Sequence, residues 1–293
     1  MKGFIIGFIV FMLLLAAVIG NCSNDSDDFS DAPAKVVDTQ RKQKPNNMKE
    51  DKEEINIDNP PSLSVDFIDI EIPRSSSIEN EIVLRRVAYS ISNNSKTKCP
   101  NWVAWHLTAE HADGPYPRLK QFHEEEELPT PRATLEDYKG SGWSRGHMCP
   151  AGDNKWDAEA MYESFSLANV CPQNANLNSG LWNSIEMDCR RWARKFGDIY
   201  IVCGPVYLRR EHETIGYNKV YVPEAFFKVV LCLNGTPKGF GFIVRNTDGN
   251  KKRDLYYNSI DQVERITGYD FFPALPDSIE NEVEAKLDMN LWY

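Results

Sequence analysis

A polar, acidic stretch near the N-terminus most limits what this chain can fold into. Residues 23 to about 75 carry mainly Ser, Asn, Asp, Lys and Pro, with few large apolar side chains. Such a segment cannot bury enough apolar surface to offset the entropy that it loses on ordering. We therefore predict a flexible tether over residues 22–75 and one compact domain over residues 76–293. The roughly two hundred residues of that domain are enough for a sizeable core.

The segment before the tether has the layout of an export signal. Lys2 precedes an apolar run from Phe4 to Ile19, which is somewhat shorter than the ~20 residues of a membrane span. The run ends in Ile-Gly-Asn-Cys22, and this ending resembles a bacterial lipoprotein signal, although Asn21 replaces the usual small residue. We expect a signal over residues 1–21, a lipid on Cys22, and a domain anchored to the bacterial cell envelope, periplasmic or on the cell surface. An ordinary signal peptide and an uncleaved anchor are the alternatives.

The charge balance excludes a strongly basic surface. The whole chain has a net charge of -10, and the stretch from Cys22 to Asn80 holds 14 acids and 7 bases. With Lys2 counted, about -4 is left for the remaining residues. A protein that grips nucleic acid through its overall field is usually basic. Any phosphate-binding surface on this chain must therefore be local.

The globular part contains an even number of cysteines, which in an exported protein can form disulfides. These are Cys99, Cys149, Cys171, Cys189, Cys203 and Cys232. Their spacing matches neither a zinc knuckle nor a redox motif. We expect at least one disulfide without assigning the pairs. The alternative is that they are small buried hydrophobic residues.

The order of the expected elements indicates an α+β fold, with a central, mostly antiparallel sheet and helices packed on it. Helices are expected over residues 157–167, 178–196, 259–267 and 278–287. Strands are expected over residues 81–90, 101–108, 198–204, 219–222, 226–233 and 239–244. Asn234-Gly235 is a typical hairpin turn between the last two strands.

Two stretches hold the candidate chemistry, Gly142–Pro150 and Asn169–Arg190. In the second, four residues follow one another at intervals of four, which places them on one face of a helix. They are Asn178, Trp182, Glu186 and Arg190. A base, an amide, a carboxylate and arginines are what a metal-assisted attack on a phosphodiester needs.

Each candidate has a chemical reason and a structural alternative. Neutral His147 beside Arg145 can accept a proton from water, although a lone histidine is more often structural. The Asn178 amide suits a hard cation such as Mg²⁺, whose bound waters Glu186 could contact. Asparagines also cap helices, and basic residues late in a helix complement its dipole. We expect Trp182 to serve both as core and as a wall of the site.

Three motifs in order resemble the DNA/RNA non-specific endonuclease family, whose sites have the ββα-metal, or His-Me finger, arrangement. They are Asp137-Tyr-Lys-Gly-Ser-Gly-Trp-Ser-Arg-Gly-His-Met148, Asn169-Val-Cys-Pro-Gln173 and Leu177-Asn-Ser-Gly-Leu-Trp-Asn-Ser-Ile-Glu186. The similarity runs from about Ile82 to Leu275 and includes Val222-Pro-Glu-Ala-Phe-Phe-Lys228.

The resemblance implies a role for each matching residue. It makes His147 the general base, Asn178 the Mg²⁺ ligand and Glu186 the acid that orients metal-bound water. Arg145 and Arg190 lie near the scissile phosphate, and Asn169 supports the site. It also implies Mg²⁺ as the cofactor, with Mn²⁺ as a substitute, and DNA and RNA as substrates. The products would carry a 5′-phosphate and a 3′-hydroxyl.

One position departs from the family pattern, which is Asp-Arg-Gly-His. Ser144 replaces the Asp, and this removes a negative charge from beside Arg145 and His147. An altered metal dependence or an inactive homologue would follow from such a change. The rival functions are therefore a catalytically inactive surface lipoprotein that binds nucleic acid, and a module that binds protein or glycan on the same scaffold.

Overall fold

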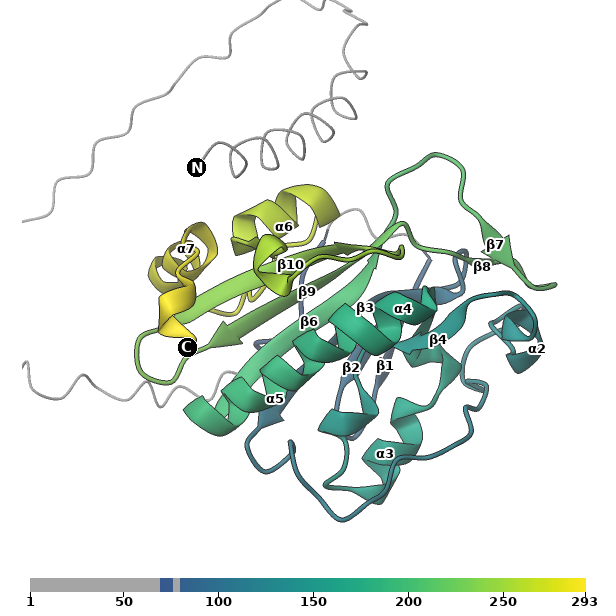
Figure 1. Ribbon diagram of the computed structural model, residues 1–293, viewed down its shortest axis with the longest axis horizontal. Coiled ribbons are helices and arrows are strands. Elements are labelled where there is room, and N and C mark those ends of the chain that lie inside the picture. Colours follow the sequence, from purple (N-terminus) through teal and green to yellow (C-terminus); the bar gives the residue numbers. More distant parts are fainter. Residues whose placement is uncertain (1–68, 76–79) are drawn as a thin grey trace, which may run out of the picture. The chain divides into compact units, whose positions relative to one another are not determined.

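The computed structural model describes residues 69–75 and 80–293 (Figure 1). The predicted signal, Cys22 and the predicted tether up to residue 68 lie outside the described residues. Ile70 is fully buried, and Arg74 and Asp270 exchange two backbone hydrogen bonds of 2.9 Å. The last residues of the predicted tether therefore contact the domain. In the part that is described, no helix has the length and apolar character to cross a bilayer.

A seven-stranded antiparallel sheet forms the centre of the domain, in the order β1-β2-β3-β6-β9-β10-β11. Its strands are β1 Glu81–Arg85, β2 Ser90–Asn94, β3 Cys99–Thr108, β6 Asp198–Val206, β9 Ala225–Cys232, β10 Lys238–Arg245 and β11 Tyr257–Asn258. The expected strand over residues 81–90 is interrupted, because residues 86–89 form the turn between β1 and β2. The predicted α+β class is confirmed.

The helices lie on both faces of this sheet (Figure 1). They are α2 Leu135–Tyr138, α3 Ala158–Ser164, α4 Ala175–Leu177, α5 Asn183–Phe196, α6 Ile260–Thr267 and α7 Asp277–Ala285. Helix α5 ends at Gly197, whose φ of 98° is a conformation that favours glycine. The predicted helix over residues 178–196 is present, but its first turn, Asn178–Trp182, is π-helical.

Alternation along the strands assigns each face to its helices. Phe226 and Val230 of β9 lie in the core cluster that contains Ile185 of α5, whereas Phe227 lies in the cluster that contains Val263 of α6. In β10, a methyl group added at Gly241 would lie 2.5 Å from Val263. The glycine therefore lets α6 pack directly on the sheet.

Two short two-stranded sheets lie beside the main sheet. Strand β4, Ser144–His147, pairs with β5, Val170–Gln173, and β7, Thr214–Ile215, pairs with β8, Val220–Tyr221. Figure 1 shows β4 next to α4 and the β7–β8 hairpin projecting beyond it. The β4–β5 pair, followed in the chain by α4 and α5, forms a ββα unit.

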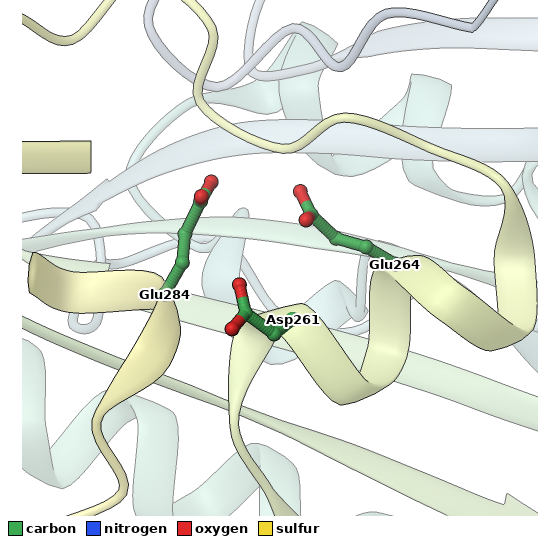
Figure 2. A group of neighbouring side chains, drawn as sticks. All are labelled: Asp261, Glu264 and Glu284. Carbon is green, nitrogen blue, oxygen red and sulfur yellow. The ribbon is translucent and has the colours of Figure 1, made fainter. Parts of the chain in front are cut away.

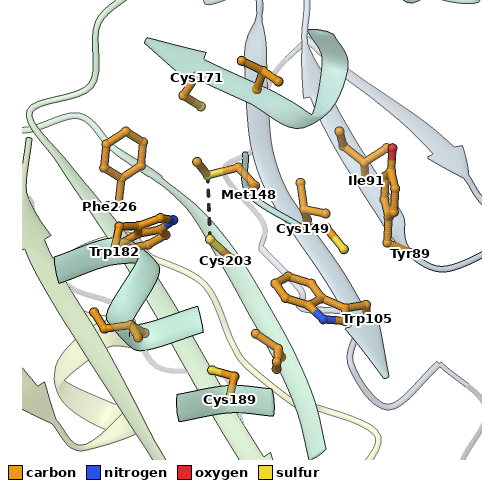
Figure 3. Close-up of a cluster of buried hydrophobic side chains, with 14 of the residues drawn as sticks. Tyr89, Ile91, Trp105, Met148, Cys149, Cys171, Trp182, Cys189, Cys203 and Phe226 are labelled. Carbon is orange, nitrogen blue, oxygen red and sulfur yellow. Dashed lines mark hydrogen bonds between the residues drawn. The ribbon is translucent and has the colours of Figure 1, made fainter. Parts of the chain in front are cut away.

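The six cysteines of the domain are all buried and free, so the expectation of a disulfide is wrong for the described residues. Figure 3 shows four of them among the apolar side chains between the sheet and α5. Cys203 Sγ contacts Met148 Sδ at 3.7 Å. The cysteines pack as small hydrophobic residues, which is the alternative that composition alone left open.

Candidate active site

Asn169 fixes the turn that follows His147. Its Oδ1 accepts a hydrogen bond of 2.9 Å from Cys149 N, and its Nδ2 donates to Cys149 O and Ser164 O at 2.8 and 2.9 Å. The Met148 amide donates to Asn169 O at 2.9 Å. Because this buried amide bonds only to the backbone, Asn169 positions the end of β4. Its role as a supporting residue of the site stays a prediction.

His147 lies between two phenylalanines, each of which carries an arginine. The imidazole is 4.9 Å from the Phe122 ring and 5.0 Å from the Phe165 ring. Arg145 lies over Phe122 at 4.7 Å and Arg118 over Phe165 at 5.2 Å. The rings hold the imidazole in place, and the two guanidiniums flank it.

The surroundings keep His147 neutral. Burial, together with the charges of Arg118 and Arg145, lowers the pKa of His147 to about 3. Its Nε2 atom is buried and has no hydrogen-bond partner among the described residues. An imidazole in this state accepts a proton, and a phosphate that neutralised the two arginines would make it more basic.

The π-helical turn Asn178–Trp182 begins the helix of the site, and such turns are common at functional sites. Trp182 is completely buried, so it belongs to the core and forms no exposed wall. Asn178 is half-buried. Its backbone N–H donates to Asn174 O at 2.9 Å, whereas its side-chain amide makes no hydrogen bond to another described residue. A half-buried amide oxygen without a partner fits a hard cation.

Glu186, two turns further along the helix, is half-buried and has charged neighbours of both signs. The pKa of Glu186 is raised to about 7, because burial and the charge of Asp153 outweigh the opposing charges of Lys228, Arg190 and Arg118. Arg118 acts on both Glu186 and His147, so the strand residue and the helix residue share one site. Such a carboxyl group ionises readily when another positive charge approaches. Together with the free amide of Asn178, it is a donor set that suits a divalent cation.

Arg190 is held by an aspartate that sequence reasoning missed. Arg190 Nη1 lies 2.7 Å from Asp153 Oδ1, and Trp105 Nε1 donates to Asp153 Oδ2 at 3.2 Å. A methyl group added at Gly152 would lie 2.6 Å from Arg190 Nη1. The turn Ala151–Asp153, which follows His147 closely, therefore places this guanidinium beside the site.

Lys228 is a second charged residue that sequence reasoning did not assign. It is fully buried, and its Nζ lies 4.9 Å from the Trp105 ring and 5.0 Å from the Trp182 ring. Its pKa is raised in spite of burial, by Cys203 and Cys189 and then by the carboxyl groups of Glu186 and Asp153. The sequence signal for Lys228 was a lysine within an apolar strand, where a buried charge is costly unless a neighbouring group compensates it.

Comparison with known proteins places the chain in a family. The model of the DNA/RNA non-specific endonucleases matches residues 70–278. The chain belongs to this family.

Individual DNA/RNA non-specific endonucleases are similar over most of the domain. The mitochondrial nuclease EXOG of Xenopus laevis is 36% identical over 206 residues, which is 64% of this chain and 58% of that protein. The mitochondrial endonuclease G of Caenorhabditis elegans is 35% identical over 224 residues, 70% of this chain and 72% of that protein. The matched region thus spans little more than half of the EXOG proteins.

A solved structure agrees with this placement. The crystal structure of the EndoG/EndoGI complex, which concerns the mechanism of EndoG inhibition, superimposes with a TM-score of 0.62 at 28% identity. The match covers 66% of this chain and 86% of that chain. The antiparallel sheet and the ββα unit described above are therefore the expected architecture of the family.

Ser144, the departure from the family motif, lies at the start of β4 opposite Gln173. The Ser144 side chain is half-buried. The pKa of His147 is shifted by burial of the imidazole and by the charges of Arg118 and Arg145. An aspartate at position 144 would oppose the arginines and make His147 more basic. Ser144 thus leaves the two arginines beside His147 without the negative charge that the family pattern places there.

A separate group of carboxylates lies across the sheet, on α6 and α7. The carboxyl oxygens of Asp261, Glu264 and Glu284 all lie within 4.8 Å of one another. Figure 2 shows the two α6 side chains beside that of Glu284 from α7. None of the three is a predicted site residue, and Glu264 already accepts a hydrogen bond of 2.8 Å from Phe271 N.

Proposed function

We propose that this protein is an exported, metal-dependent endonuclease that hydrolyses the phosphodiester bonds of DNA and RNA. The observation that carries the proposal is the neutral His147, whose buried Nε2 is unpartnered and which is flanked by Arg118 and Arg145. Membership of the DNA/RNA non-specific endonucleases supports the substrate class. Little sequence preference follows, because contacts to phosphates carry no base information.

Each side chain has a defined part in this reaction. His147 takes the proton of the attacking water, while Arg145 and Arg118 offset the charge that develops on the phosphate. Asn178 and Glu186 would hold Mg²⁺, with Mn²⁺ as a substitute. When bound, the cation would supply Lewis-acid stabilisation of the phosphate and of the leaving 3′-oxygen. Arg190, fixed by Asp153, adds a positive charge on the helix side.

The test uses purified protein with plasmid DNA and a structured RNA, each in Mg²⁺ and in EDTA. We expect both substrates to be cut in Mg²⁺ alone, leaving ends that a ligase accepts directly because they carry a 5′-phosphate and a 3′-hydroxyl. Loss of the general base in His147→Ala should slow cleavage by about 10²–10⁴-fold. No metal-dependent cleavage of either polymer would sink the proposal.

A matched control separates the base from any other histidine. His106 pairs with Asp198 at 2.9 Å and stacks on Tyr200 at 4.4 Å, and neither partner belongs to the site. His106→Ala should therefore keep wild-type cleavage. Equal activity of the His147→Ala and His106→Ala proteins would show that another group is the base. Asn178→Ala should raise the Mg²⁺ concentration required for half-maximal cleavage, whereas His147→Ala should leave it unchanged.

We also propose the cellular location that the N-terminal residues suggest, a lipid anchor on Cys22 in the bacterial envelope. The supporting observation is the sequence around Cys22, which resembles a lipoprotein signal. Metabolic labelling with a radioactive fatty acid should mark the wild-type protein and should not mark Cys22→Ser. Label retained in Cys22→Ser would remove the proposed attachment site.

A further inference from the structure

A groove on the described part of the domain is lined by cations and by no acidic residue. It consists of two adjoining cavities of about 380 and 510 Å³, which share Lys96 and Tyr221. Its positive side chains are those of Lys96, Lys98, Arg210 and Lys219. In a chain with a net charge of -10, four cations without an acid form a local site for an anion.

Two acidic residues that flank the β7–β8 hairpin in the chain already accept hydrogen bonds. Glu224 accepts from His212 Nδ1 at 3.0 Å and from Leu208 N at 2.8 Å. Glu213 accepts a hydrogen bond of 2.8 Å from the Trp143 indole. None of the four groove cations forms an ion pair with another described residue. The Lys98 ammonium donates to Ser95 O at 2.6 Å and to Lys96 O at 3.2 Å, but no acid in the described part of the chain neutralises its charge.

An aromatic ring stands at the edge of the groove, on a fixed support. Tyr217, at the tip of the β7–β8 hairpin, is 96% exposed. Beneath it, Asp137 accepts from Asn218 N at 3.0 Å and from Asn218 Nδ2 at 2.9 Å. Gly216 has a φ of 67° and lies directly against Asp137, so the tip is held in one conformation. A large exposed ring on a rigid turn is a platform for stacking.

The groove is connected to the segment that carries the general base. Trp143, whose indole binds Glu213 next to β7, immediately precedes β4 with His147 at its end. Asp137, which fixes the hairpin tip, lies on α2, shortly before the same strand. The residues that support the hairpin at the groove thus lie on the segment that leads into the strand ending in His147.

We propose that this basic groove binds the sugar-phosphate backbone of a single-stranded nucleic acid beyond the cleavage site, with a base stacked on Tyr217. Phosphates would contact Lys96, Lys98, Arg210 and Lys219, and an unpaired base offers the ring a face to stack on. The inference rests on the proposed function, since it concerns the same polymer.

The test measures binding without cleavage, in EDTA, with the His147→Ala protein. Fluorescence anisotropy compares labelled oligothymidines of about 20 and about 4 nucleotides, because single-strand sites of this class span about 4–16 nucleotides. We expect the long probe to bind at least about 10-fold more tightly. Adding Lys96→Gln and Arg210→Gln should remove most of that difference, and Tyr217→Ala should weaken the long probe by about 10-fold.

Salt dependence and a matched double variant identify the contact. Two lost phosphate contacts should reduce the slope of log K against log salt by about 1.4. Arg265→Gln with Lys286→Gln removes the same charge from α6 and α7 and should change neither probe. If the groove variants bind the long probe as tightly as their parent, the inference is overturned.

Two further outcomes separate this inference from its foundation. With His147 intact, the groove variants should still cut the short probe at the wild-type rate. A loss of cutting that is confined to the long probe supports binding of the strand in the groove. A wild-type protein that cuts neither probe contradicts the proposed function instead. Groove variants that lose binding to phosphatidylglycerol vesicles but keep the long probe would make this surface a membrane contact, which also overturns the inference.

Discussion

Two charged regions on opposite faces of one sheet respond differently to burial. On the α5 face, Asp153 and Glu186 lie among Arg190 and Lys228. On the α6–α7 face, Asp261, Glu264 and Glu284 gather with like charges only, and burial together with those acids raises the pKa of Glu284 to about 8. Glu186 has a pKa of about 7, because cations offset its burial.

The difference shows how neighbouring charges of opposite or like sign change the energy of a buried carboxylate. In the mixed region each buried charge has an opposite neighbour, so removing a carboxylate leaves a buried guanidinium uncompensated. In the acidic region each ionised group repels the others, so removing one member relieves the rest. Loss of a carboxylate should thus destabilise the domain on one face and stabilise it on the other.

The largest effect on stability is expected from Asp153→Ala. This change leaves Arg190 without its 2.7 Å partner and Trp105 without its acceptor. Breaking a buried ion pair on one side costs about 3–5 kcal/mol, which urea denaturation monitored by tryptophan fluorescence would measure. Cleavage should also fall, because the Arg190 guanidinium loses its position.

The same helix provides the control for Asp153. Arg194 and Asp113 also form a pair, at 2.9 Å, but their side chains are 43% and 72% exposed. Asp113→Ala should leave the denaturation midpoint unchanged. Similar midpoints for the two variants would mean that burial does not strengthen the pair near the site.

The elements that depend on neighbouring residues could be predicted from the sequence. The strands over residues 226–233 and 239–244, the hairpin turn between them and the helix over residues 178–196 were predicted from neighbouring residues, and the structure contains all three. His147, Asn178 and Glu186 were found because their spacing matched a family pattern. The electrostatic role of Arg118 was missed, because the long loop before β4 has no periodicity that places a side chain.

Long-range compensation is the part that could not be read from the sequence. Strand β4 has no apolar alternation, and its pairing with β5 joins residues 144–147 to residues 170–173. Lys228 lies within an apolar strand, and only the folded chain shows that Asp153 and Glu186, from two other segments, balance its charge. The expected disulfide failed for a similar reason, since compositional parity does not bring two sulfur atoms together.

A smaller effect, on activity alone, is expected from Lys228→Met. Loss of this cation would raise the pKa of Glu186 above its present value of about 7. A rise of about one unit would lower the ionised fraction at pH 7 by about fivefold. The acidic limb of the pH–rate profile should therefore move to higher pH, with cleavage recovering near pH 9. Stability should change little, because a buried charge is lost together with its desolvation cost.

Lys238→Met is the matched variant for Lys228. Lys238, on the neighbouring strand β10, is also buried and lies over the Phe196 ring at 4.0 Å, but it does not influence the pKa of Glu186. Its pH–rate profile should remain that of the wild type. An equal shift in both variants would show that buried lysines affect the sheet generally and not the site.

The smallest effect, of opposite sign, is expected from Glu284→Gln. The folded pKa of about 8 lies above the ordinary value of 4.5, so the wild type loses stability as the pH rises from about 4.5 to about 8. The glutamine variant avoids this loss and should melt about 3 °C higher at pH 8 but equally at pH 4.5. Glu282→Gln, on the exposed side of α7 where Glu282 pairs with Lys286 at 2.6 Å, should give no such gain. A melting temperature at pH 8 that falls in Glu284→Gln would mean that the carboxylate is compensated there, and the contrast between the two faces would not hold.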